Sequence, residues 1–283
     1  MPRARPPRVF AMIVACAASR QVHPRSRSTP CRQTSPLPFP PSRRPGPSAA
    51  GQQAAELDAG APPPGAQAGI FVISAGTLLF QVAFIRIFSA SIWYHFAFLV
   101  VSVALFGIGA SGAALALIPD RGRDPLLRSI APALFAVSAI GAYLGTAAIP
   151  FSPFQLLQQP VQVVYFLLYD LLLLVPFFFS GATVALILRD WPARAGQLYA
   201  FDLIGAACGT ALLFALLPLL GARGAIALAA ALGATSALLL APTTRVRAGC
   251  ATLLALIAPL VVAPQLLPEP RVDSSKPVAQ QLA

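Results

Sequence analysis

Charged side chains are scarce in this sequence: they make up 10% of its 283 residues, while 57% are hydrophobic. A soluble globular domain carries about 25% charged residues. Because so little charge cannot cover a surface that faces water, the composition excludes an ordinary soluble protein. It indicates instead a chain that lies largely in a lipid bilayer, which is the first partner we expect.

Cysteine and histidine are too few and too scattered to build a metal site or a disulfide framework. The four cysteines show no CxxC or other paired spacing, and there are only two histidines. Metal sites and disulfide frameworks need such clusters. We therefore expect no metal and no cofactor in this chain. Cys208 and Cys250 lie in apolar segments, where they are expected to pack as small apolar side chains.

Lysine occurs only once, although the formal net charge is +11. Arginines supply almost all of the positive charge, and they cluster in the first 66 residues and in short joints between apolar blocks. A nucleic-acid surface would need a folded basic face with aromatic platforms. Arginines in short joints are typical of membrane topology signals instead, so we expect no nucleic-acid partner.

The first 66 residues lack any long apolar run. They hold 9 of the 20 Lys and Arg residues and 14 of the 29 prolines, a composition that cannot bury enough surface to fold. We expect a disordered leader over residues 1–66. A second interpretation stays open, because the short apolar stretch that ends in "IVAC" (Ile13–Cys16) resembles a lipoprotein cleavage box.

Seven apolar blocks follow, and a membrane helix needs about 20 apolar residues. We therefore expect an all-α fold: a polytopic transmembrane bundle of about seven spans over residues 67–268, with residues 269–283 as a tail. The sixth block is short, and the seventh is interrupted by two prolines. The blocks are Ile70–Phe88, Phe96–Ile118, Arg128–Ile149, Val161–Leu188, Leu198–Leu220, Ala225–Leu240 and Gly249–Leu267.

The arginines predict an orientation. The joints after the second, fourth and sixth blocks hold at least two arginines each, whereas the joints after the first and third hold none. Because positively charged loops stay in the cytoplasm, we expect a multi-pass protein of the bacterial inner membrane with a cytoplasmic N-terminus. Seven crossings would place the tail outside, and a re-entrant seventh block would keep it inside.

Three charged residues, Arg86, Asp170 and Asp202, lie within the apolar blocks. Each costs about 2.5–3.5 kcal/mol near the bilayer centre, and less near a helix end. Because that cost has to be offset by a role, all three are candidate functional residues. Asp170 lies in the outer part of the fourth block beside Tyr165 and Tyr169, where tyrosine commonly anchors a helix at the membrane interface.

Asp202 shares one predicted helical face with Tyr199, Gly205 and Gly209. Gly205 and Gly209 form a GxxxG pair, which lets a neighbouring backbone approach closely. Asp202 is therefore expected to face another helix. Two roles stay open for it: an interhelical clamp, or part of a transport or ligand pathway. The partners that we expect are Arg86, Tyr94 and Tyr169.

Two other blocks carry small or polar patterns. In the first, Ser74, Thr77 and Gln81 form one stripe, which predicts either the lining of a polar cavity or hydrogen bonds between helices. In the second, "GIGASG" matches the spacing of a dinucleotide-binding loop. That loop needs a preceding strand and a helix N-terminus, whereas these glycines lie inside an apolar block. They are expected to serve close helix packing. The glycines are Gly107, Gly109 and Gly112.

Two longer stretches, Leu78–Gly112 and Pro176–Ala222, resemble the membrane portion of bacterial multi-pass spermidine synthase-like proteins. The first has an amide before an arginine and then a glycine-rich span; the second ends in the pattern G-x-LY-x-x-D-x-x-GA-x-x-G. The resemblance covers about residues 68–267. The matching positions are Gln81, Arg86, Tyr94, His95, Gly107, Gly109, Pro176, Gly181, Gly196, Leu198, Tyr199, Asp202, Gly205, Ala206 and Gly209.

The resemblance implies a transferase. In such proteins the membrane part precedes a soluble Rossmann-like domain similar to aminopropyltransferases and S-adenosylmethionine-dependent methyltransferases, whose glycine-rich loop and acidic residues are not found in this sequence. The leading hypothesis is a membrane domain without catalytic residues, which anchors or serves a transferase domain or subunit. An alternative is a small transporter or channel-like protein that uses Arg86, Asp170 and Asp202. A third is the product of a frameshifted gene.

Overall fold

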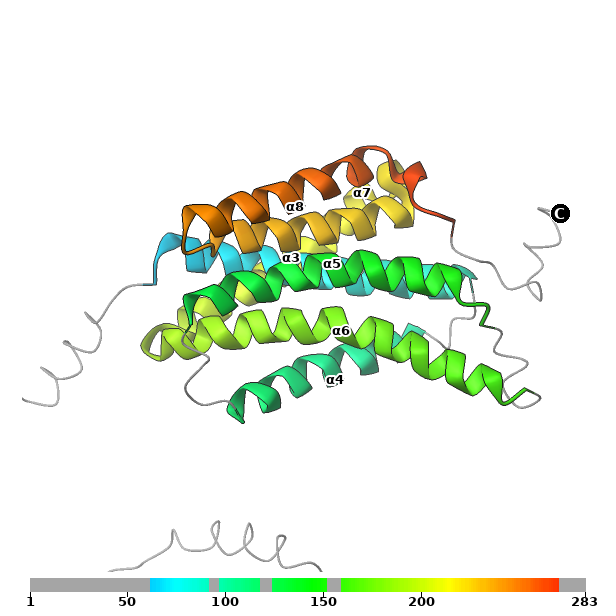
Figure 1. Cartoon of the computed structure of the whole chain (residues 1–283), viewed down its shortest axis with the longest axis horizontal. Helices are drawn as coiled ribbons and strands as arrows, with labels where there is room; N and C mark the ends of the chain where they lie inside the picture. The colour runs from blue at the N-terminus through cyan, green and yellow to red at the C-terminus, as the bar shows by residue number, and fades with distance from the viewer. Residues whose placement is uncertain (1–61, 92–96, 118–123, 152–158, 270–283) are drawn as a thin grey trace, which may run out of the picture. The chain divides into compact units, whose positions relative to one another are not determined.

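The computed structural model describes residues 62–91, 97–117, 124–151 and 159–269. Within these ranges the chain is helical and has no strand, which confirms the predicted fold class. Six of the described helices are long and apolar enough to cross a membrane, and they lie alongside one another (Figure 1). They are α3 (Pro64–Ser91), α4 (Ala97–Ala116), α5 (Pro125–Ala148), α6 (Val161–Asp190), α7 (Ala195–Leu239) and α8 (Thr244–Val262).

The long helix α7 reverses direction at Gly221. Its 45 residues would span about 68 Å if straight, more than twice the thickness of the hydrocarbon core. At Gly221 the backbone has φ 63° and ψ −177°, a region that essentially only glycine adopts. Pro218 lies one turn earlier and removes a backbone donor. Together these residues turn the chain back on itself.

Both halves of α7 pack on α3, in opposite directions. In the first half, Gly205 lies against Phe71 and Gly209 lies against Ala75, so the two helices run parallel there. In the second half, Ser236 donates a hydrogen bond to the carbonyl of Gly69, while Ala229 lies nearer the far end of α3, against Gly76. The second half is therefore antiparallel to α3, and the six helices provide seven segments of membrane length.

The predicted boundaries differ from the structure at several helix ends, and the seventh block is displaced most, because α8 runs from Thr244 to Val262 where we expected Gly249–Leu267. Two other differences involve proline and glycine. The fifth and sixth predicted blocks are joined by the sharp bend at Gly221, where we expected a loop from Gly221 to Gly224. The first helix begins at Pro64, so the helical domain starts before the predicted boundary at residue 67. Both differences arise because proline and glycine interrupt a hydrophobic run without necessarily ending a helix: proline is tolerated at a helix start.

Contacts between side chains and backbone define the two ends of the bundle. At one end, the Ser129 hydroxyl of α5 donates to the carbonyl of Ala237 and lies 3.5 Å from Cys250 of α8. We call this the arginine end, because α6 ends and α8 begins there with the residues Arg189, Arg194, Arg245 and Arg247 nearby in sequence.

At the other end, which we call the tail end, the Tyr143 hydroxyl donates to the carbonyl of Pro268 at 2.5 Å. Arg223 donates to the carbonyl of Leu267 at 3.1 Å. Because α8 connects the two ends, it runs along the whole bundle, as a crossing segment would. The start of α3 and the residues after α8 therefore lie at opposite ends.

Aromatic side chains of α3 fill the centre of the bundle. Phe80 is fully buried, and its ring centroid lies 4.8 Å from that of Phe84, 5.9 Å from that of Phe135 and 5.5 Å from that of Phe177. These residues come from α3, α5 and α6. Since the hydrophobic effect is weak between helices in lipid, close packing of this kind supplies much of the attraction.

Candidate functional site

Asp202 joins α7 to α3. The Ser74 hydroxyl of α3 donates a hydrogen bond to Asp202 Oδ1. One and two turns further along α7, a Cβ built on Gly205 would lie 2.3 Å from the carbonyl oxygen of Phe71, and one on Gly209 would lie 2.1 Å from that of Ala75. No real Cβ fits at such distances, so the two glycines allow the backbones to touch. This close approach brings Ser74 within reach of the short aspartate side chain.

The partners that we expected for Asp202 are different from those in the structure. The Arg86 guanidinium stacks on the ring of Phe214, 5.3 Å from its centroid, and the Tyr169 hydroxyl donates to the carbonyl of Thr146 at 2.6 Å. The reason is distance along α3: twelve residues, about 18 Å, separate Ser74 from Arg86. Tyr94, the third expected partner, and His95 lie outside the described residues.

Tyr199 does not share the buried face of Asp202. Its side chain is 53% exposed, whereas Gly205 and Gly209 are buried against α3. The close packing against α3 therefore covers the glycine part of the predicted face and does not reach Tyr199. The physical reason is that Tyr199 lies about one turn from the start of α7 at Ala195, so helical spacing alone does not make a neighbour available there.

The polar stripe of the first block makes a second contact between helices. Thr77 of α3 and Ser180 of α6 are both buried and form a hydrogen bond. The Thr77 hydroxyl also lies 2.7 Å from the carbonyl of Ile73, and either Thr77 or Ser180 can donate the hydrogen bond between the two hydroxyls. Gln81 is half-buried, one turn further along α3. Ser74 and Thr77 thus serve as interhelical hydrogen-bonding groups.

The three glycines of α4 have different surroundings. A Cβ on Gly107 would lie 2.9 Å from the Cβ of Phe177 and 3.0 Å from the carbonyl of Leu174, so Gly107 packs closely against α6. Gly109 and Gly112 have nothing within 4 Å of that position. Within the described helices, the expectation of close packing is therefore wrong for these two residues, which lie on the exposed side of α4.

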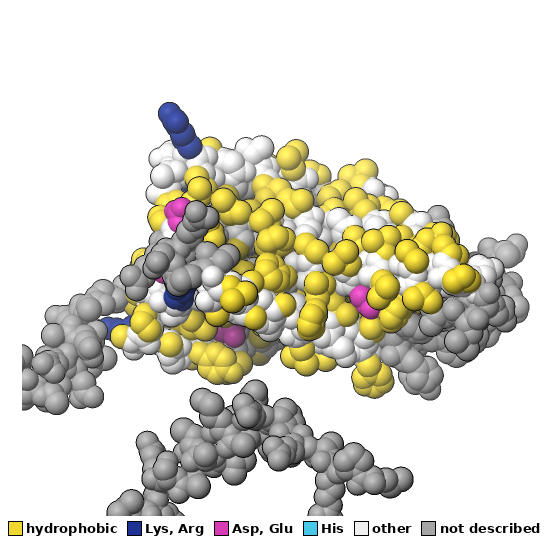
Figure 2. Space-filling view, turned by 60° about the horizontal axis from the view of Figure 1, so that its bottom comes forward, with side chains coloured by type: hydrophobic (Ala, Val, Ile, Leu, Met, Phe, Trp, Pro, Cys, Tyr) yellow, Lys and Arg dark blue, Asp and Glu magenta, His cyan; other side chains and the backbone are white. Residues whose placement is uncertain are grey.

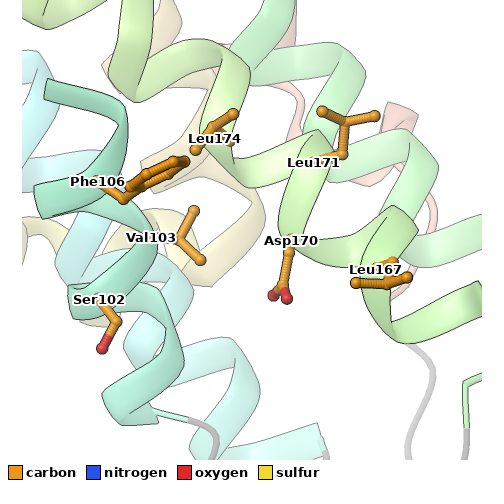
Figure 3. Close-up of a pocket in the computed structure, with 7 residues that line it drawn as sticks. All are labelled: Ser102, Val103, Phe106, Leu167, Asp170, Leu171 and Leu174. Atoms are coloured by element: carbon orange, nitrogen blue, oxygen red, sulfur yellow. The ribbon is translucent and has the colours of Figure 1, made fainter. Parts of the chain in front are cut away.

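Asp170 faces a pocket of about 390 Å³ between α4 and α6 (Figure 3). It is the only charged residue among those that line this pocket. Its Oδ1 atom is buried and has no hydrogen-bond partner in the part of the chain that the structure describes. The other lining residues are Ser102, Val103, Phe106, Leu167, Leu171 and Leu174.

Sequence reasoning missed an ion pair at the arginine end. Arg128 Nη1 lies 3.1 Å from Asp190 Oδ2, and the Arg128 guanidinium lies 5.1 Å from the ring centroid of Trp191. A signal was present, because the third block begins and the fourth ends on the same predicted side of the membrane. Ser102 and Ser180 were missed as well, and no spacing in the sequence singles them out.

The described residues offer no metal site: no three His, Cys, Asp or Glu side chains lie close enough together to hold an ion. Comparisons with protein-family models, with curated proteins and with solved structures give no match to this chain. The fold and the polar contacts inside it define the class as a multi-pass helical membrane protein.

Proposed function

We propose that this chain is the integral membrane domain of a spermidine synthase-like protein, which anchors or serves a transferase domain or subunit. The sequence stretches Leu78–Gly112 and Pro176–Ala222 support this relationship by their resemblance to that family. The observation that supports an anchoring role is that polar side chains form hydrogen bonds between helices. Ser74 bonds to Asp202, and Thr77 bonds to Ser180, which is typical of a packed bundle.

The intramembrane charges do not gather into one site, which favours an anchor over a conduit. Asp202 lies beside Ser74, Arg86 stacks on Phe214, and Asp170 faces the pocket between α4 and α6. A pathway for ions or polar substrates needs its polar groups to face a common cavity. On this proposal the catalytic residues belong to the transferase.

The proposed orientation has the arginine end in the cytoplasm of a bacterium and the tail end on the outer side of its inner membrane. It follows from the positive-inside rule and from the exposed positions of Arg245 and Arg247. A transferase that uses a cytoplasmic cosubstrate would then meet the arginine end as a separate subunit, because a domain joined after Glu269 would lie on the outer side. Labelling of single cysteines at the two ends tests this orientation.

The second candidate function is transport, which the buried Oδ1 of Asp170 favours, since this atom has no hydrogen-bond partner among the described residues. The chain would be reconstituted in vesicles, and the fluxes of protons, potassium and radiolabelled spermidine would be measured. If the bundle is an anchor, all three fluxes equal those of empty vesicles, in wild type and in Asp202→Asn alike.

The contradicting result is a saturable flux in wild type that Asp170→Asn or Asp202→Asn removes from a protein that is still folded. Gly205→Leu serves as the structural control. The leucine side chain would collide with the backbone of Phe71 and disrupt the packing of α7 on α3. If Asp202→Asn acts only by disrupting this packing, Gly205→Leu should have the same effect on the flux. Retained helicity in circular dichroism separates the two cases.

A further inference from the structure

The pocket between α4 and α6 combines apolar walls with one carboxyl group. Val103 and Phe106 of α4 and Leu171 and Leu174 of α6 supply apolar wall, and Asp170 projects into the space between the helices (Figure 3). Asp170 is half-buried, and its buried Oδ1 has no partner among the residues described. A carboxylate in such surroundings is stabilised by a cation that also donates hydrogen bonds.

The depth of Asp170 in the bundle indicates where that cation comes from. Its neighbour Tyr169 packs on Phe88, near the end of α3, with ring centroids 5.9 Å apart. Tyr169 also bonds to the carbonyl of Thr146, near the end of α5. Phe88 is about ten residues, or about 15 Å, from the middle of α3. Asp170 therefore lies in the tail-end half of the bundle, and by its distance along α3 it comes toward the edge of a hydrocarbon core about 30 Å thick.

The pocket is open on the apolar side of the bundle. Phe106 of α4 and Leu167 and Leu171 of α6 line it and are exposed, and many hydrophobic side chains are exposed on the face of the molecule in Figure 2. In a bilayer such a surface contacts acyl chains. A molecule that fills this pocket therefore has a cationic head at the boundary and an apolar chain that extends toward the bilayer centre.

We propose that the pocket between α4 and α6 binds an aminophospholipid, whose primary ammonium group donates hydrogen bonds to the carboxylate of Asp170. One acyl chain lies along Phe106 and Leu174. A primary ammonium fits because it has three N–H donors, whereas a quaternary ammonium has the same charge and no donor. This site is independent of the proposed transferase partner and of any transport activity.

The test uses photoactivatable lipids in nanodiscs that contain the full-length chain. One lipid is a phosphatidylethanolamine with a diazirine in its acyl chain, and the other is the matching phosphatidylcholine. After illumination, mass spectrometry measures how often each lipid attaches to peptides from α4 and α6. We expect the ethanolamine lipid to label these peptides at least about fivefold more than the choline lipid, because only its headgroup makes a charge-assisted hydrogen bond.

Asp170→Asn should bring this ratio close to one, because the amide keeps the shape and loses the charge. Glu269→Gln is the matched control: it removes an exposed acid at the same end of the bundle, and the ratio should stay at the wild-type value. Equal labelling by the two lipids in wild type would overturn the proposal. The cation beside Asp170 would then be another group, such as a free amine or a lysine of a partner helix. A preference that survives Asp170→Asn would overturn it too.

Discussion

Gly209→Ala is expected to destabilise the bundle by about 3 kcal/mol or more. The added Cβ would lie 2.1 Å from the carbonyl oxygen and 2.6 Å from the Cα of Ala75, and these atoms belong to a helix backbone that cannot rotate away. α3 and α7 must therefore separate along the contact that also holds Ser74 against Asp202. The free energy of unfolding in mixed micelles, measured by titration with a denaturing detergent, gives the effect.

Gly109→Ala is the matched control for this prediction. It is the same substitution inside a membrane helix, but nothing lies within 4 Å of the added Cβ. Because alanine favours a helix over glycine by about 1 kcal/mol, this variant should be neutral or slightly more stable than wild type. Equal losses in both variants would show that α3 and α7 do not pack through Gly209.

Phe80→Ala is expected to cost about 3–5 kcal/mol of stability. The Phe80 ring is fully buried and contacts the rings of Phe84, Phe135 and Phe177, so its removal leaves a cavity where three helices meet. In lipid the loss is one of dispersion contacts rather than of hydrophobic transfer. The same detergent titration measures it.

For this second prediction the control is Phe98→Ala on α4, whose side chain is 72% exposed. The substitution exchanges contacts with lipid, not with protein, so its effect should lie within about 0.5 kcal/mol of wild type. If Phe80→Ala lowered the stability as little as Phe98→Ala, the claim that the aromatic rings around Phe80 hold the bundle together would be wrong.

Much of the fold could be predicted because each membrane segment is recognisable by its length and its apolar composition. The seven blocks, the close contact at Gly205 and Gly209, and a helix facing Asp202 all follow from local rules. What the sequence could not supply was the neighbour. Helical spacing says which side of α7 Asp202 lies on, but Ser74 and Arg86 belong to the same block, and only the packed structure shows which one is at the right level.

The glycine pattern of α4 was a less reliable signal than the GxxxG pair of α7, for a physical reason. Gly107 and Gly109 are two residues apart on α4, and one packs against α6 while the other is open. In a soluble protein an exposed face would be marked by polar residues, but a face that contacts lipid is as apolar as one that contacts a helix. Gly221 is a related case. Pro218 and Gly221 indicated that the helix is interrupted, but the reversal of α7 depends on the backbone conformation of Gly221. Glycine can adopt that conformation but does not have to, so the sequence does not predict it.

Cysteine labelling tests most directly that α8 crosses the membrane and that the arginine end of the bundle lies in the cytoplasm. In a chain whose four cysteines are replaced by alanine, Thr243→Cys and Glu269→Cys each place one thiol, at the arginine end and at the tail end respectively. A membrane-impermeant maleimide is expected to label the second variant in intact cells and the first only after lysis. Labelling of both thiols from the same side would contradict the crossing by α8, and the reverse pattern would contradict the orientation.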